Sequence, residues 1–416
     1  MNRLCRFGVT RVVASLSVIL SATSAVAQSQ TPGQVTQFDP NLNVVDSVIT
    51  QDPSGNIGIG TTVPAARLDV VGGNLNLENS SLTAGNVLKG GALFLHNFGF
   101  QNTFLGSNAG NLTMFGTGLN TGVGYEALEN NRFGSQNTAA GAEALENNVD
   151  GQSNTALGAF ALTANIRGGS NTAIGVGALG NNTTAFSNTA VGNLALQSNN
   201  GFENTATGVW ALTLNTTGDA NTADGLGALQ GNTTGRLNTA SGFSALIINR
   251  TGSNNTAIGA RADVTADGLT NATAIGSDAL VDSSNKIRLG STQVIVIEGQ
   301  VPYTFTSDRK QKENFRPVNG EEVLRKLGGL NLTSWNYIGH DPRQFRHYGP
   351  VAQEFFAAFG DDGVGTIGTP TTINSGDLEG ILMIAVQTLE KQNAELKARI
   401  EALEQLVKTV SDQRER

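Results

Sequence analysis

The stretch Asn137-Thr138-Ala139-Ala140-Gly141-Ala142-Glu143-Ala144-Leu145 is one copy of a pattern, N-T-A-x-G-x-x-A-L, that recurs along the middle of this chain. The spacing is 17 residues, with one step of 16. A fixed short period indicates a repeat architecture, and this one is too short for two packed helices. Further copies begin at Asn154, Asn171, Asn188, Asn204, Asn221, Asn238 and Asn255, and degenerate copies at Asn102, Asn120 and Ala272.

Each repeat predicts one coil of a stacked β structure. The Thr-Ala-x segment is a short strand, the Gly is the point where the chain bends, and the Ala-Leu pair faces inward. Asn and Gly tolerate left-handed backbone conformations, so we expect them at the corners of the coil. Parallel strands stack about 4.8 Å apart, and about ten or eleven coils make a rod of roughly 50 Å. We also expect the repeated asparagines to hydrogen-bond to one another along the stack.

The interior of one coil is thin, because Ala and Leu are its main apolar residues. Oligomerisation is a natural way for such a chain to bury enough apolar surface. The repeats resemble the head repeats of trimeric autotransporter adhesins, with a close local match at Asn271-Ala272-Thr273-Ala274-Ile275-Gly276-Ser277. This resemblance implies a mostly β shaft over residues 101–300, a left-handed parallel β-roll in a homotrimer, although the usual period of that family is shorter.

The composition of the 416 residues excludes several classes of function. Hydrophobic residues make up 39% and aromatic residues 6%, too little for a large aromatic-rich enzyme core. The net charge of −8 argues against binding to nucleic acid or to an anionic membrane surface. Glu203, Asp219 and Asp224 do not recur in register, so neither a calcium-binding repeat nor a glycosidase-type carboxylate pair is indicated. We expect no metal site and no cofactor.

Residues 1–27 have the pattern of a secretory signal peptide. Arginines precede a short apolar stretch, Val12 to Leu20, and Ala25-Val26-Ala27 forms a cleavage site before Gln28. Cleavage there removes Cys5, the only cysteine, together with three arginines and no acid, so the net charge shifts from −8 to −11. We expect an exported protein that is extracellular or on the cell surface, with the periplasm as the other compartment, and no membrane span after signal removal.

Two regions separate the signal from the shaft. Residues 28–50 are polar and show no clear period. Residues 51–100 are expected to form a collar-like β segment, because the stretch from Gly55 to Val70 resembles the collar placed ahead of the shaft in phage tail fibres. Alternating apolar residues predict two short strands there, at Asn56–Ile59 and Leu68–Val70, joined by a proline turn.

The composition changes after Gln300, which indicates a separate domain. Residues 301–416 contain 14 Lys+Arg and 16 Asp+Glu, against 9 and 18 in the longer span 28–300. The most distinctive run is Thr306-Ser307-Asp308-Arg309-Lys310-Gln311-Lys312-Glu313-Asn314-Phe315. A serine hydroxyl becomes a nucleophile when a base removes its proton, and a neutral, desolvated lysine is such a base. The same spacing also occurs in solvated charged segments that have no catalytic role.

This run and two later features resemble the C-terminal intramolecular chaperone, a self-cleaving peptidase domain, of phage endosialidase tailspikes. Related domains occur in other phage fibres, in bacterial surface proteins and in the myelin regulatory factor. The family carries S-D-x-R-x-K-x-N-I, then G-x-x-A-Q-E, then a coiled coil. Here Lys310 replaces the arginine and Phe315 the aliphatic residue. The residues that match are Ser307, Asp308, Lys312 and Asn314 in the first motif and Gly349, Ala352, Gln353 and Glu354 in the second.

The resemblance covers residues 301–416 and implies a chaperone and auto-cleavage domain at 301–376, followed by its coiled coil at 377–416. Such a domain brings three chains into register and then releases itself by cutting between Thr306 and Ser307. The resemblance implies that Ser307 attacks the carbonyl of Thr306, that Lys312 is the general base, and that water hydrolyses the resulting ester. Each chain turns over once, so the enzymatic act is a single autoproteolytic event.

A heptad pattern is visible near the C-terminus, with leucine at each d position. β-Branched residues at a with Leu at d are typical of two strands, and an Asn at an a position specifies register. The shaft and chaperone resemblances favour three strands instead, and a further alternative is a single amphipathic helix that folds onto its own domain. The pattern comprises Leu382, Val386, Leu389, Asn393, Leu396, Ile400, Leu403 and Val407.

The favoured interpretation is an exported, trimeric fibre with a self-cleaving chaperone. The alternative is a structural adhesin or shaft whose trimerisation domain stays attached and has no peptidase activity. His340 and His347 are expected to be structural, and Trp335, Tyr337 and Tyr348 to pack in the domain core. The sequence does not indicate a ligand for the shaft.

Overall fold

The computed structural model of the chain describes residues 34–38, 44–294, 296–298 and 307–414. The chain divides into two compact units, one ending at Ser291 and the other beginning at Thr292. In the part of the chain that is described, no helix is both long and apolar enough to cross a membrane. The signal segment and its cleavage site lie outside the described residues, so that prediction stays a prediction.

A four-stranded sheet precedes the shaft. Its strands are β1 (Gln34–Phe38), β2 (Val44–Gln51), β3 (Ile57–Ile59) and β4 (Leu68–Val70). β3 and β4 are the two short strands predicted from the alternating pattern, and they pair in parallel. β1 and β2 pair antiparallel in a stretch where no period indicated strands.

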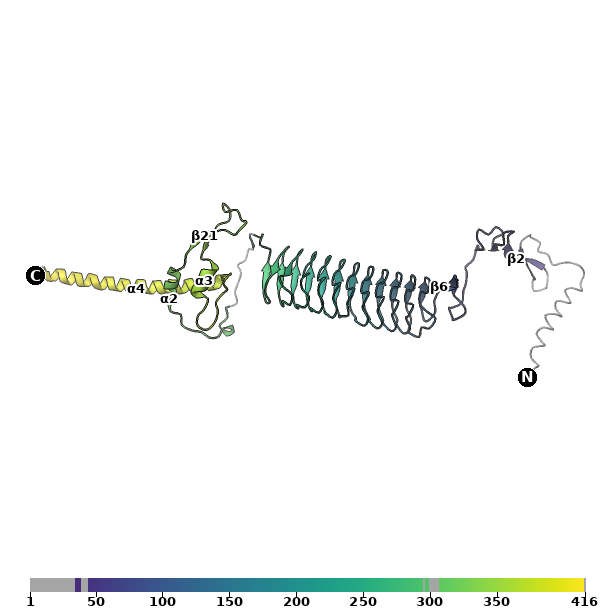
Figure 1. Cartoon of the computed structure of the whole chain (residues 1–416), viewed down its shortest axis with the longest axis horizontal. Helices are drawn as coiled ribbons and strands as arrows, with labels where there is room; N and C mark the ends of the chain where they lie inside the picture. The colour runs from purple at the N-terminus through teal and green to yellow at the C-terminus, as the bar shows by residue number, and fades with distance from the viewer. Residues whose placement is uncertain (1–33, 39–43, 295, 299–306, 415–416) are drawn as a thin grey trace, which may run out of the picture. The chain divides into compact units, whose positions relative to one another are not determined.

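The shaft is a parallel β-solenoid of about eleven coils, and each coil adds one strand to a single sheet (Figure 1). Strands stack in register, so that Thr155 pairs with Thr172 and Ala156 with Ala173. Equivalent residues of successive coils therefore lie directly beside one another, as the 17-residue period predicts. The strands are β7 (Thr103–Leu105), β8 (Thr121–Val123), β9 (Thr138–Ala140), β10 (Thr155–Leu157), β11 (Thr172–Ile174), β12 (Thr189–Val191), β13 (Thr205–Thr207), β14 (Thr222–Asp224), β15 (Thr239–Ser241), β16 (Thr256–Ile258), β18 (Thr273–Ile275) and β20 (Ile287–Leu289).

The two ends of the shaft differ from its middle. At the start, β5 (Val87–Lys89) and β6 (Ala92–His96) form an antiparallel hairpin that pairs with β7. At the far end, β17 (Asp263–Val264) pairs with β19 (Leu280–Val281). These short strands bury Val264 and Val281, each one residue after the position at which the regular coils bury a leucine.

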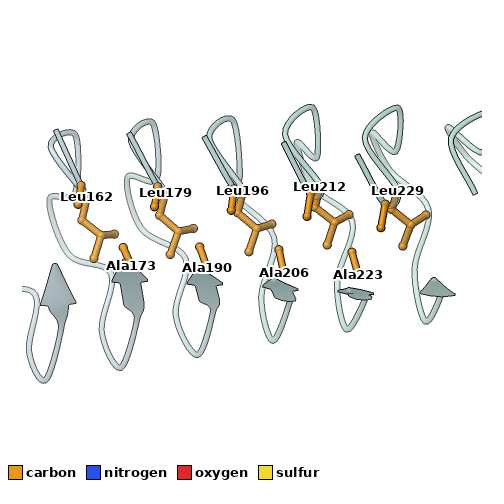
Figure 2. Packing of buried hydrophobic residues seen from close by; sticks show 14 of the residues in the cluster. Leu162, Ala173, Leu179, Ala190, Leu196, Ala206, Leu212, Ala223 and Leu229 are labelled. Carbon is orange, nitrogen blue, oxygen red and sulfur yellow. The ribbon is translucent and has the colours of Figure 1, made fainter. Parts of the chain in front are cut away.

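Alanine and leucine fill the interior of the regular coils, as predicted. The strand alanines, such as Ala173 and Ala190, face the leucines of the Ala-Leu pairs, such as Leu179 and Leu196, across each coil (Figure 2). These side chains are fully buried. Burying one leucine contributes about 2 kcal/mol, so the stacked rows of alanine and leucine are the main apolar stabilisation of the shaft.

Some of the residues that have a left-handed backbone conformation were not predicted to have it. The repeat glycines have positive φ, +144° at Gly141 and +136° at Gly158, as predicted for the bend. The asparagines that open the regular repeats are not in this conformation, whereas Asn254, Asn271 and Asn285 are, so the prediction for asparagine holds only in part. The leucines of the Ala-Leu pairs adopt it instead, with φ of 52° at Leu145 and 53° at Leu162. This conformation costs about 1 kcal/mol per residue, and burial of the leucine side chain offsets it.

The asparagines that open each repeat are buried and form the predicted ladder. The Nδ2 atom of Asn154 donates to Oδ1 of Asn137 at 3.2 Å and to the carbonyl oxygen of Gly168 at 2.8 Å. The backbone N–H of Asn154 donates to the same Oδ1 at 2.9 Å. Each side chain therefore satisfies polar groups of neighbouring coils that burial would otherwise leave unpaired.

A second asparagine ladder runs through another turn of the coil. Nδ2 of Asn165 donates to Oδ1 of Asn148 at 2.8 Å, and Nδ2 of Asn182 donates to Oδ1 of Asn165 at 2.9 Å. The ladder breaks at the 16-residue step, where Nδ2 of Asn199 donates to the carbonyl oxygen of Gly201 at 2.8 Å. Oδ1 of Asn182 is consequently buried with no hydrogen-bond partner among the described residues.

The C-terminal unit is a small α+β domain. Asn319 caps α2 by accepting hydrogen bonds from the backbone N–H groups of Glu321 and Glu322. Val323 of α2, Phe355 and Phe359 of α3, and Ala385 of α4 form the buried centre of its core. The elements are the 3-10 helix η1 (Arg309–Gln311), α2 (Gly320–Gly328), β21 (Thr333–Trp335), β22 (His347–Gly349), α3 (Ala352–Phe359) and α4 (Ser375–Arg414).

The long helix α4 has two apolar faces. One face, with Ile381, Ile384 and Ala385, packs in the domain core, and Nε2 of Gln392 donates to Oε2 of Glu321 of α2 at 2.6 Å. The other face carries the heptad residues and is exposed, so α4 folds onto its domain through residues other than those of the heptad. The exposed apolar heptad residues are Leu382, Val386, Leu389, Leu396, Ile400, Leu403 and Val407.

Candidate functional site

The segment that follows Thr306 is folded by local hydrogen bonds around η1. The side chain of Asp308 caps this 3-10 helix, because its Oδ1 accepts the backbone N–H of Lys310 at 2.9 Å. The backbone N–H of Lys312 donates to the carbonyl oxygen of Arg309 at 3.2 Å and closes the turn. Asp308 therefore has a clear structural role, which is to hold the turn that separates Ser307 from Lys312.

This turn brings Ser307 and Lys312 together. Nζ of Lys312 donates to Oγ of Ser307 at 2.6 Å. A nucleophile within hydrogen-bond reach of its base is the arrangement that nucleophilic catalysis requires. The residues named from the sequence as nucleophile and base are thus in contact in the structure, and their catalytic roles stay a prediction. Thr306, on the other side of the predicted scissile bond, lies outside the described residues.

Both members of this pair are exposed to solvent in a single chain. A lysine in water is a cation at neutral pH and has no lone pair to accept a proton. Removing water from around the amine favours its neutral form, and only that form is a base. One chain therefore positions Ser307 and Lys312 but does not surround them with the environment that proton transfer needs.

Asn314, the last residue of the first motif that matches the family, has a left-handed conformation, with φ of 60°. Asparagine tolerates this region better than most residues, which explains its use at this bend. Next to it, the guanidinium of Arg309 lies over the ring of Phe315, 4.7 Å from its centroid. Phe315 thus packs on the segment through a contact that an aliphatic residue cannot make.

The second motif joins β22 to α3. Gly349 ends β22 with φ of 147°, and Ala352 begins α3. Oε2 of Glu354 accepts the backbone N–H of Asn331 at 3.3 Å, while Gln353 is exposed. These residues place α3 so that Phe355 and Phe359 enter the core. Within the described residues, no hydrogen bond or ion pair joins this motif to the Ser307–Lys312 turn.

Residues 307–364 match the family model described as chaperone of endosialidase. The match begins at Ser307 and includes both motifs, so the family predicted from these residues is confirmed. The chain is therefore a fibre-like protein in which a β-solenoid shaft is followed by a chaperone-of-endosialidase domain. No curated protein and no solved structure matches the chain significantly.

The histidines of the chaperone-of-endosialidase domain lie in an aromatic cluster. His347 stacks on Trp335 with 4.7 Å between ring centroids, and Tyr337 contacts His340 edge-on at 5.6 Å. No described hydrogen bond links either histidine to Ser307, and the structural role expected for both stays a prediction. Tyr337 is 57% exposed and Tyr348 is 87% exposed, so the prediction that these two tyrosines pack in the core was wrong. Trp335 is half-buried.

One group of acids in the shaft was not predicted from the sequence. Carboxylate oxygens of Glu126, Glu129 and Glu146 lie within 4.8 Å of one another, on neighbouring coils. Burial, followed by repulsion from neighbouring glutamates, raises the pKa of Glu129 and of Glu146. Glu129 and Glu146 are 17 residues apart, so the repeat period itself was the signal that could have paired them.

Proposed function

We propose that this chain is an exported fibre protein whose C-terminal domain directs the assembly of three chains and then releases itself by cutting before Ser307. The observation that carries the proposal is the 2.6 Å hydrogen bond from Nζ of Lys312 to Oγ of Ser307. It falls at the first residue of the segment that matches the chaperone of endosialidase. The shaft in front of that segment is the product that cleavage would release.

The proposed reaction is an acyl shift followed by hydrolysis. Neutral Lys312 takes the proton from Oγ of Ser307, and the oxygen attacks the carbonyl carbon of Thr306. The peptide C–N bond then breaks, the amine of Ser307 receives the proton from Lys312, and an ester joins Thr306 to Oγ. Water hydrolyses this ester, which leaves a carboxylate on Thr306 and a free Ser307 at the start of the released domain.

Assembly supplies what one chain lacks. The Ser307–Lys312 pair is exposed in the single chain, and the heptad face of α4 is uncovered. Joining three copies of α4 would bury that face and bring the three domains together, so that neighbouring chains remove water from around Lys312. Cleavage would then follow assembly, and loss of the chaperone would make unfolding of the released shaft hard to reverse.

A structural fibre with an uncleaved domain is the alternative. The exposure of Lys312 favours it, because an amine that stays in water does not remove the proton of Ser307. Lys310 in place of the family's arginine favours it too, since lysine does not make the bidentate contacts of arginine. In both cases the protein is exported to the cell surface or the medium, and no small-molecule substrate is required.

Two lysines of the same turn provide a matched test. In the full-length chain, Lys312→Met should slow the appearance of the released fragment about 100-fold or more, which is the usual effect of losing a general base. Lys310→Met, two residues away, should cut at the normal rate. Native mass of each variant should show the same assembly. Equal cutting in both variants, or loss of cutting in Lys310→Met alone, would remove Lys312 from the mechanism.

A further inference from the structure

A continuous apolar band runs along one corner of the shaft. This corner band consists of the residues immediately before and after the repeat glycine in T-A-x-G-x. The residue before the glycine points away from the interior, because the preceding alanine is buried. Ile174 is 38% exposed and Val176, on the other side of the same glycine, is 48% exposed. Soluble monomers leave few such patches uncovered when they extend over many neighbouring residues.

The two rows of the corner band compensate for each other. In three successive coils the residue before the glycine is polar, and in the same three coils the residue after it is large and apolar. Each of these three coils therefore still presents an apolar side chain at the corner, and the corner band continues along the shaft. The polar residues are Thr207, Asp224 and Ser241, and their apolar counterparts are Val209, Leu226 and Phe243.

Charge is almost absent from the corner band. Asp224 is the one charged residue at these positions from Leu105 to Leu289, and its Oδ1 accepts a hydrogen bond from Oγ1 of Thr207 at 2.5 Å. About eleven coils give a band about 50 Å long, and the three residues of x-G-x span about 10 Å of each coil, so the band covers roughly 500 Å². A stable protein–protein interface buries about 800 Å² on each partner, so the band supplies the larger part of one.

The binding partner that fits the corner band is a second copy of this chain. The band repeats once per coil, and a parallel copy presents the same residues with the same spacing, whereas an unrelated partner would need to reproduce that period. The exposed heptad face of α4 is a second uncovered surface of the chain. Its pairing in a parallel coiled coil would align copies in register and so bring equivalent coils of the shaft together.

We infer that the corner band is the surface along which copies of the shaft pack against one another in the fibre. This inference rests on the proposed assembly of three chains and adds where they touch. The charged side chains of Arg167, Arg236 and Arg250, which are exposed and lie outside the corner band, then remain in water. Substitutions at the band should therefore affect assembly without affecting the fold of a single shaft.

Disulfide trapping tests the inference in the full-length chain. Cys5 is the only cysteine, so Cys5→Ser gives a cysteine-free background, and Ser307→Ala keeps the chaperone attached. Into this background we would place Ile174→Cys in the corner band or Thr184→Cys, an exposed residue of the same coil outside the band. After mild oxidation, Ile174→Cys should give cross-linked pairs in about two-thirds of the chains, since a ring of three has one unpaired cysteine. Thr184→Cys should stay unlinked.

The native mass of the cysteine-free chain, measured without oxidation, distinguishes a failure of the corner band from a failure of the proposed assembly. A trimer with cross-links through Thr184→Cys, through both cysteines equally, or through neither would overturn the corner band while leaving the proposed assembly intact. A monomer would overturn both. As a second variant, Ile174→Arg without the Ser307→Ala change should release a shaft that falls apart into single chains, while the shaft released from the unchanged protein stays trimeric. Equal mass of the two released shafts would contradict the inference.

Discussion

The asparagines of the shaft and the Ser307–Lys312 pair are both polar groups positioned by a short sequence pattern, yet their surroundings are opposite. Asn154 is fully buried, and its amide bonds to the next coil on either side. Ser307 and Lys312 are bonded to each other and exposed to water. The ladder at Asn154 is therefore satisfied within one chain, whereas Ser307 and Lys312 are correctly placed for reaction but are not shielded from water.

This difference separates stability from activity. Damage inside the shaft should change its resistance to unfolding and leave the chemistry at Ser307 intact. Changes at the Ser307 turn should stop cleavage and leave the shaft as stable as before. Variants of the two regions thus test whether they are independent, and their expected effects decrease from the apolar interior to the ladders and then to a single buried acid.

The largest effect on the shaft is expected for Leu179→Ala. This leucine is fully buried in the middle of the stack, and removing it leaves a cavity lined by neighbouring coils. The loss should be about 3 kcal/mol in the free energy of unfolding, measured by guanidinium denaturation. Thr184→Ala, an exposed residue five positions on, is the control and should change the midpoint little. A similar loss in both variants would show that the stacked interior does not dominate stability.

The second asparagine ladder gives a matched pair with a smaller effect. Oδ1 of Asn165 accepts from Asn182, but Oδ1 of Asn182 is buried and has no described partner. Asn165→Ala breaks bonds on both sides and should cost about 2 kcal/mol. Asn182→Ala breaks the two bonds that Nδ2 of Asn182 donates, to Asn165 and to the carbonyl oxygen of Ala185, but it also removes an Oδ1 that is already unpaired. Its cost should therefore be lower than that of Asn165→Ala in the same denaturation experiment. Equal costs would mean that the gap at the 16-residue step is filled in solution.

A buried acid near the end of the shaft should make stability depend on pH. Asp263 stands where the other repeats have the inward-facing leucine, and burial raises its pKa to about 6. Because the folded state holds this proton more tightly than the unfolded chain, ionisation above pH 6 destabilises the fold. Stability should rise by about 1 kcal/mol as the pH falls from about 7 to about 5. Asp263→Asn should remove this increment, and an unchanged pH profile in the variant would assign it to other groups.

The repeat pattern predicted the structural features that arise from contacts between equivalent residues of adjacent coils. The Thr-Ala strands, the buried Ala-Leu pairs and the ladder at Asn137 follow from a single count of 17 residues, and the second ladder was available from the same count. The left-handed conformation of the leucines could not be predicted from this count, because the φ angle at Leu145 is set by the way in which the whole coil closes. The pairing of β1 with β2 also depends on contacts that no local period encodes.

The candidate site likewise has features that the sequence predicted and features that it did not. Spacing and resemblance identified Ser307 and Lys312, and the capped turn at Asp308 explains why residues five apart meet. The exposure of the pair and of Tyr348 was not predictable, since exposure depends on how the domain and its copies pack. Residue types alone indicate which groups can react, whereas packing determines whether water is removed from around them so that they can react.

Self-cleavage before Ser307 is tested by measuring the intact mass of the expressed full-length chain beside that of its Ser307→Ala variant. We predict that the unchanged chain gives a separate fragment that begins at Ser307 and ends at Arg416, and that the variant stays whole although it assembles equally well. If both chains stay whole while each forms a folded trimer, self-cleavage is contradicted. The protein is then a structural shaft that keeps its chaperone domain.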